Sequence, residues 1–156
     1  MVKHLVYFAL ALLAATGLLP VNATTSSQRV DANWRQEELD IVNQLRRDAG
    51  LSPLKIDDRL NQVAQEHSEY MAKIHELTHE DPAGPIGQRV TDKDVRWTAV
   101  GENVASGPLE VDFVVSLWSG SAGHNANMLG NYNYVGFGLA SDGHTPFWTQ
   151  VFAYEV

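Results

Sequence analysis

Two histidines and one glutamate stand in three short polar segments that could form a single chemical centre. His79 lies in the segment LTHE, Glu102 in GENVA and His124 in GHNANML. Two imidazoles and one carboxylate are the smallest ligand set of an open zinc site, which leaves a further position for water or a ligand. The sequence therefore predicts a centre at His79, Glu102 and His124 that could hold one divalent cation such as zinc. Because the three residues are far apart in the chain, only the fold can unite them.

Each of these residues also has an ordinary structural explanation. His79 could be a solvent-exposed loop residue, Glu102 an exposed strand carboxylate, and a histidine at a helix start often bonds backbone groups. A serine nucleophile is another alternative, with Ser121 activated by His124 as base and Glu102 as the group that orients that base. The segment around Ser121 lacks the first glycine of a nucleophile elbow and does not join a strand to a helix, which argues against this alternative.

Further residues are expected to surround the centre. His67 recurs at helical spacing with apolar residues, so it either packs in the core or orients one of the centre residues from behind. Asn103 follows Glu102 and favours local hydrogen bonding. Trp118 is expected in the core or in a cavity wall. His75 and His144 are predicted to be surface residues.

The elements that must position these side chains follow from the hydrophobic pattern. Helices are expected over 33–49 and 58–74, with a short helical piece at 88–91, a helix at 110–117 and a helical turn at 125–129. Strands are expected at 100–105, 135–139 and 147–154, the last two forming a hairpin around Asp142-Gly143. The rest of 80–99 is predicted to be a turn-rich, irregular loop, and 51–54 an extended connection. This order predicts an α+β fold in which helices cover a small antiparallel sheet.

The beginning of the chain is predicted to be a signal peptide. A short basic start is followed by an apolar run and a small-residue cleavage pattern ending at Ala23, and the run is too short for a membrane anchor. We therefore assign residues 1–23 to the signal peptide, 24–32 to an N-terminal extension and 33–156 to one domain. A secreted, extracellular protein without a membrane anchor is expected. Since the chain has no cysteine, its stability must come from packing and hydrogen bonds.

The charge of the chain excludes some partners. Nineteen acidic residues against eleven basic ones give a formal net charge of −8. A polyanion is repelled by such a protein, so neither nucleic acid nor an anionic lipid surface is expected as a partner.

In its ordered motifs the chain resembles the CAP superfamily, named for cysteine-rich secretory proteins, antigen 5 and pathogenesis-related class 1 proteins, whose shared unit is the SCP domain. The segments that carry the resemblance are AQEHSEYM at 64–71, LTH at 77–79, GENVA at 101–105, Trp118 with SAGHNANML at 121–129, VGFG at 135–138 and FWTQVF at 147–152. The chain is similar to short, cysteine-free members of the family.

The resemblance implies a three-layer α-β-α sandwich with an open cavity, where the family places two histidines and two glutamates that can hold a divalent cation. His79, Glu102 and His124 match three of the four, and the second glutamate falls on Ser121. Glu80 or Asp81, beside His79, is an alternative source of the missing carboxylate. Gln150 lies in the strand segment that the resemblance places near the cavity.

The resemblance implies two kinds of function. The leading hypothesis is a secreted binding or effector module, for a small lipid or sterol or for an extracellular protein partner, with its cavity centred on the two histidines and Glu102. The rival is a metal-assisted hydrolase, similar to a protease, that uses the same centre to activate water. Because fold alone does not determine activity, whether the protein is an enzyme stays open at this point.

Overall fold

The computed structural model describes residues 32–156. In chain order these residues form α1 (Trp34–Asp48), β1 (Lys55–Ile56), α2 (Asp58–Ile74), α3 (Ile86–Thr91), β2 (Trp97–Ser106), α4 (Val111–Ser119), α5 (Ala122–Met128), β3 (Tyr134–Ser141) and β4 (Pro146–Glu155). The predicted signal peptide and nearly all of the predicted extension lie outside the described residues. No helix within 32–156 has the length and apolar character needed to cross a membrane.

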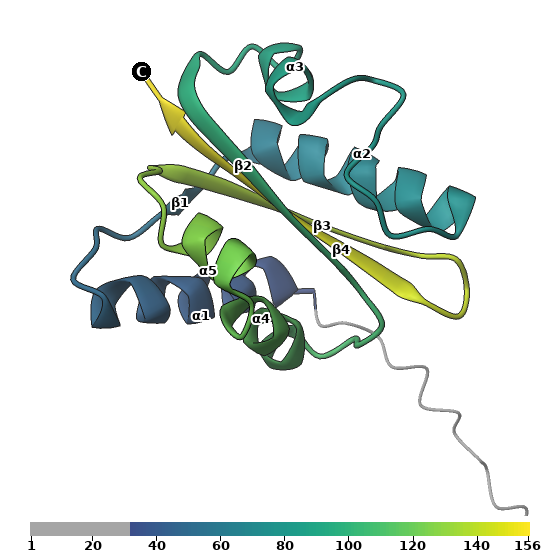
Figure 1. Ribbon diagram of the computed structural model, residues 1–156, viewed down its shortest axis with the longest axis horizontal. Coiled ribbons are helices and arrows are strands. Elements are labelled where there is room, and N and C mark those ends of the chain that lie inside the picture. Colours follow the sequence, from purple (N-terminus) through teal and green to yellow (C-terminus); the bar gives the residue numbers. More distant parts are fainter. Residues whose placement is uncertain (1–31) are drawn as a thin grey trace, which may run out of the picture.

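Helices cover both faces of a four-stranded sheet in the order β1-β3-β4-β2 (Figure 1). On one face α2 and α3 pack against the sheet through a core that includes Leu60, Val63 and Val90. On the other face α1, α4 and α5 enclose a larger core around Trp118 and Trp148. The predicted α+β class and the three-layer α-β-α arrangement are therefore confirmed.

The predicted small antiparallel sheet contains one parallel pairing that the sequence analysis did not anticipate. β1, which follows the predicted extended connection 51–54 and was not predicted as a strand, pairs in parallel with β3, so that Lys55 lies opposite Tyr134. A strand of two residues has no alternation to detect, and its pairing depends on a segment far along the chain. The other element boundaries differ by a few residues: β2 begins at Trp97, and α5 already begins at Ala122.

Helix α2 lies unusually close to the sheet. Its first turn is capped by the side chain of Asp57, which accepts a hydrogen bond from the backbone of Arg59. A Cβ atom built on Gly136 or Gly138 of β3 would stand 2.0 or 2.2 Å from a backbone carbon of α2. The two glycines thus allow helix and strand backbones to touch, which determines how far His67 reaches toward the site.

Neighbouring residues of β2 serve opposite faces of the sheet, as side chains alternate along a strand. Glu102 points toward α2 and α3, where it meets Arg89, whereas Asn103 points toward α5 and β4, where it meets Gln150. Because β2 is an edge strand, both helical layers can be reached from this point. The candidate site is built around that edge.

Candidate functional site

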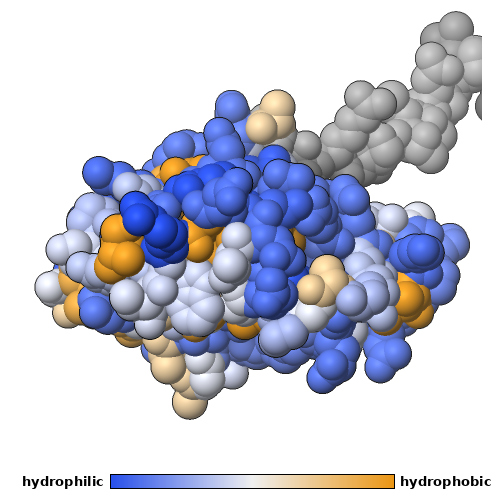
Figure 2. Space-filling model, turned by 90° about the horizontal axis from the view of Figure 1, so that it is seen from above, coloured by the Kyte–Doolittle hydropathy of each residue, from blue (hydrophilic) through white to orange (hydrophobic). Residues whose placement is uncertain are grey.

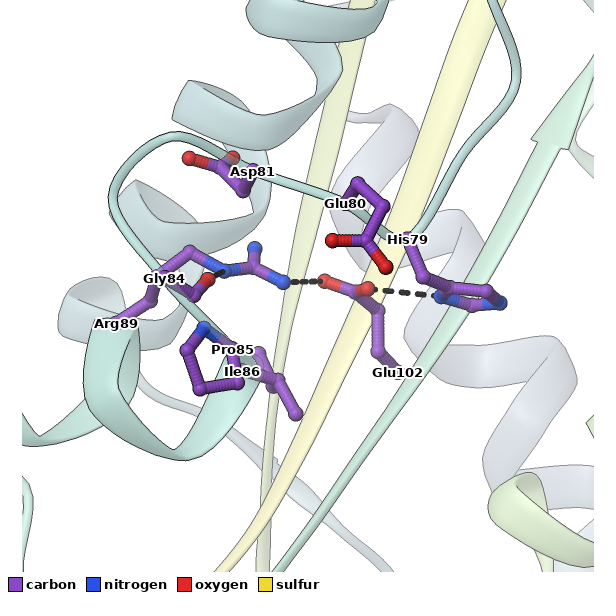
Figure 3. A pocket seen from close by; sticks show the side chains of 8 residues that line it. All are labelled: His79, Glu80, Asp81, Gly84, Pro85, Ile86, Arg89 and Glu102. Carbon is purple, nitrogen blue, oxygen red and sulfur yellow. Dashed lines mark hydrogen bonds and ion pairs between the residues drawn. The ribbon is translucent and has the colours of Figure 1, made fainter.

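The carboxylate of Glu102 is the buried centre of the site. Its Oε1 accepts a hydrogen bond from Nδ1 of His79 at 2.9 Å, and its Oε2 accepts one from Nη2 of Arg89 at 2.7 Å (Figure 3). The side chains of Glu102 and Arg89 are 4% and 6% exposed, whereas that of His79 is 59% exposed. Glu102 is therefore held from two sides, and one of its partners faces solvent.

The side chain of His67 forms hydrogen bonds to the loop that carries His79. This fully buried ring has its Nδ1 2.7 Å from Oδ2 of Asp81 and its Nε2 2.9 Å from the carbonyl oxygen of Thr78. Since a carbonyl oxygen only accepts, Nε2 must be the donor. The same nitrogen lies 3.8 Å from Oε1 of Glu102. The structure thus places His67 in the core and also directly behind the centre.

A cavity of about 480 Å³ opens beside this centre. It is lined by His79, Glu80, Asp81, Gly84, Pro85, Ile86, Arg89 and Glu102. In Figure 3 the carboxylate of Glu80 points toward that of Glu102, whereas Asp81 points away and is engaged by His67 and by the backbone of Ala83. Of the two predicted substitutes for the missing carboxylate, Glu80 is the one that faces the centre.

His124 approaches the same centre from the opposite layer. Burial lowers the pKa of its ring, and the proximity of His79 lowers this pKa further. Its backbone oxygen accepts a hydrogen bond from Nδ2 of Asn103 at 3.0 Å. The fold thus brings His124 within electrostatic reach of His79, as the sequence predicted, although the two histidines come from different layers.

The lowered pKa of His124 makes the stability of the folded domain depend on pH in a testable way. A ring with a folded-state pKa below its unfolded value of 6.5 contributes stability above that value, which is lost as the pH falls through the folded pKa. Replacing His79 by glutamine is expected to raise the pKa of His124 toward 6.5 without reaching it, because the effect of burial remains. NMR titration of the imidazole signals checks this. An unchanged midpoint would mean that the two rings do not interact.

Two predicted neighbours of the centre, Trp118 and Ser121, do not line the cavity. Trp118 belongs to α4 and is buried in the core, where its Nε1 donates to the carbonyl of Val104 at 3.1 Å. Ser121 precedes α5 as its N-cap residue, without a side-chain capping bond. Among the hydrogen bonds of the described chain, none joins Ser121 to His124, so the geometry does not support a serine nucleophile.

Arg89 and Glu38 are parts of this region that the sequence analysis missed. Arg89 lies in the short helical piece predicted at 88–91, where nothing in the local pattern marks it as the partner of Glu102. The burial of Glu38 could have been predicted from the sequence. It stands four residues from both Trp34 and Val42, so it shares the buried face of α1.

Comparisons with known proteins agree with this geometry. The model of the cysteine-rich secretory protein family, CAP, matches residues 39–152. The chain belongs to this family. It is 30% identical to the uncharacterized protein YkwD of Bacillus subtilis over 84% of this chain and 51% of that protein, so it spans about half the length of this relative.

Solved structures show the same fold for this CAP domain. An extracellular SCP-domain protein from Bacillus anthracis superimposes with a TM-score of 0.71 and 26% identity over 82% of this chain and 42% of that chain. An outer surface protein of Borrelia burgdorferi gives a TM-score of 0.70 and 24% identity over 78% of this chain and 95% of that chain.

The residues of this CAP domain do not fit a metal ion as they stand. Within residues 32–156 no three His, Cys, Asp or Glu side chains are grouped so that they could hold one. Both oxygens of Glu102 are already bonded, and Arg89 places a buried positive charge 2.7 Å from one of them. A cation at Glu102 would therefore compete with a guanidinium group that already neutralises the carboxylate.

Proposed function

We propose that this CAP domain is secreted and acts outside the cell as a binding module, and that the cavity beside His79 recognises a polar group of a protein partner. The observation that carries this proposal is the cluster of titratable side chains in the cavity wall, His79, Glu80, Asp81, Arg89 and Glu102, around a carboxylate that is already held in place. A preformed site of this kind loses little conformational entropy when a partner binds.

The exposed ring of His79 is the best placed group for such contacts. Its Nδ1 is bonded to Glu102, which sets the orientation of the ring and leaves Nε2 without a hydrogen-bond partner among the described residues. Glu80 stands beside it in the cavity wall. Because Nδ1 is the donor nitrogen of the ring, Nε2 of the neutral ring accepts, as does the carboxylate of Glu80, so the two neighbouring groups can bind hydrogen-bond donors of a partner.

A sterol or fatty acid is less well matched to this cavity. Small apolar ligands usually bind in pockets with mainly hydrophobic walls, but here Pro85 and Ile86 are the large apolar side chains among the lining residues. Figure 2 shows a mainly hydrophilic face with scattered apolar residues, seen from the side on which α3 lies in Figure 1. These features favour a protein partner over a lipid.

The proposed extracellular location has its own support and its own test. The similar Bacillus anthracis protein is described as extracellular, and the start of this chain has the pattern of a signal peptide. The protein recovered from the medium is expected to begin at residue 24, which a measurement of its intact mass checks. Recovery of residues 1–23 on the secreted protein would contradict the cleavage.

Site-specific crosslinking tests the binding proposal. A photo-reactive amino acid in place of Pro85, an exposed residue of the cavity wall that makes none of the proposed polar contacts, is expected to give covalent adducts with protein from the medium or cell surface of the producing organism, identified by mass spectrometry. His79→Ala should reduce these adducts, whereas the control His144→Ala, in the exposed β3–β4 turn, should not. Adducts unaffected by His79→Ala, or retention of a sterol or fatty acid from a labelled panel without protein adducts, would contradict the proposal.

The metal-assisted hydrolase is the rival proposal, favoured by the proximity of His79 to His124. A zinc titration of residues 24–156 by calorimetry distinguishes the two. Because Arg89 already neutralises Glu102, we expect no more zinc binding than in the double variant His79→Ala/His124→Ala. Stoichiometric zinc binding that disappears in the double variant would instead support the rival.

A further inference from the structure

A glutamic acid is completely buried on the face of α1 that packs against the sheet. Glu38 is 0% exposed, and its Oε1 accepts a single hydrogen bond, from Nε2 of Gln150 in β4 at 2.9 Å. Its Oε2 is buried and has no hydrogen-bond partner. Carboxyl groups are rarely buried in this way, since an ionised carboxylate normally needs several donors or a charge partner.

Glu38 ends a chain of buried amides that leads to the candidate site. Oε1 of Gln150 accepts from Nδ2 of Asn103 at 2.9 Å, and Oδ1 of Asn103 accepts from Nδ2 of Asn127 at 2.8 Å. We call Glu38, Gln150, Asn103 and Asn127 the Glu38 relay. It joins α1 to α5 across two strands of the sheet.

The relay holds the backbone at two residues of the site. Asn103 donates its second amide hydrogen to the carbonyl of His124 at 3.0 Å, and Asn127 donates its second to the carbonyl of Glu102 at 3.1 Å. Both amide hydrogens of each asparagine are thereby used. Every relay amide donates toward Glu38, which is the final acceptor.

The neutral form of Glu38 suits this position. Burial raises the pKa of Glu38 to about 8, against the smaller opposing effects of the Gln150 hydrogen bond and of Arg35. Arg35 does not bond to Glu38, because its guanidinium donates to the carbonyl of Phe137 and to Gln65. One amide donor and one distant charge are too little to stabilise an ionised carboxylate in the core.

We propose that Glu38 is a positioning residue for the site, whose neutral carboxyl group anchors the relay that holds α5, and with it His124, against β2. When Glu38 loses its proton, a buried charge without sufficient donors destabilises the packing of α1 on the sheet, so the anchor of the relay shifts and the His124 side of the site loosens. This role does not depend on which ligand the cavity binds.

The side chain of Glu102 is held by partners outside the relay, although its backbone carbonyl accepts from Asn127. Glu102 is tied by its side chain to His79 and Arg89, which come from the loop and from α3. The groups that face Glu38 are Arg35 on its own helix and the neutral Gln150 of β4, while His124 lies at the far end of the relay on α5. Since the pKa of His124 is below 6.5, it titrates on the acid side of Glu38.

NMR spectroscopy of the full mature domain tests the proposal between about pH 6 and 9.5, a range that brackets the expected pKa. In the wild type, the side-chain amide signals of Gln150, Asn103 and Asn127 and the backbone amides of α5 are expected to shift together, with a midpoint near pH 8. Glu38→Gln, which is nearly isosteric and stays neutral, should abolish this transition. The control Glu37→Gln, on the exposed side of the same helix, should keep it.

A second variant measures the anchoring itself. Glu38→Leu removes the final acceptor and should accelerate hydrogen exchange of the α5 amides roughly five- to tenfold, the factor that corresponds to one lost buried hydrogen bond. Glu38→Gln should leave this exchange near the wild-type rate. A wild-type transition that is missing, that persists in Glu38→Gln, or that is confined to α1 would overturn the proposal. Each of these results leaves the crosslinking test of the cavity unaffected.

Discussion

Gly138→Ala is expected to destabilise the domain by roughly 3–5 kcal/mol, the upper end of the range for single substitutions. A Cβ atom at this position would lie 2.2 Å from backbone atoms of Ala64 in α2. Backbone atoms cannot rotate away as a side chain can, so the whole helix must move outward. His67, one turn further along α2, would be drawn from Thr78, and the loop that carries His79 would lose its attachment.

Urea unfolding measures this loss, with Gly123→Ala as the matched control. Gly123 lies in α5, and a Cβ there would meet no atom within 4 Å, so alanine should be neutral or stabilising by up to about 1 kcal/mol. If Gly138→Ala unfolded within about 0.5 kcal/mol of the wild type, the close approach of α2 to β3 would not be essential.

Arg89→Met should have the second largest effect, a loss of about 3–5 kcal/mol. The substitution keeps most of the apolar stem but removes the guanidinium that donates to Oε2 of Glu102 at 2.7 Å. Glu102 would then be a buried carboxylate whose remaining side-chain hydrogen bond comes from the exposed ring of His79. The penalty comes mainly from the uncompensated charge that is left behind, and only partly from the lost bond.

A double variant separates these two contributions. In Arg89→Met/Glu102→Gln the buried charge is gone, so more than half of the lost stability should return in urea unfolding. Arg96→Met, at an exposed arginine nearby, is the control and should change stability by less than about 0.5 kcal/mol. If the double variant were no more stable than Arg89→Met, Arg89 would act through packing and not through the charge of Glu102.

Local sequence patterns predicted most of the elements for identifiable reasons. The apolar face of α1 and the capping Asp57 of α2 are signals between close neighbours in the chain, and both helices were predicted nearly to their ends. The Asp142-Gly143 turn indicated the β3–β4 hairpin in the same way. The two-residue β1 and the beginning of β2 depend on pairing with strands near the C-terminus, so no local pattern revealed them.

The candidate site was predictable in its polar residues but not in their arrangement. His79, Glu102 and His124 were recognised from their short motifs. The partner of Glu102 was not, because Arg89 reaches it only after α3 has folded over the edge strand. Asn103 and Gln150 were expected near the cavity, and instead they form a buried relay to Glu38, which lies 112 residues before Gln150 in the chain.

The sequence by itself determined the family, the order of the helices and strands, and the residue types available at the site. Only the tertiary structure decided that Glu102 is neutralised by Arg89, that a cavity opens beside Glu102, and that His79 and His124 come within electrostatic reach of each other from different layers. The physical reason is that β2 is an edge strand whose side chains alternate between two faces. Residues adjacent in sequence, such as Glu102 and Asn103, therefore enter separate networks, and the partners of each are selected by long-range packing that no local pattern records.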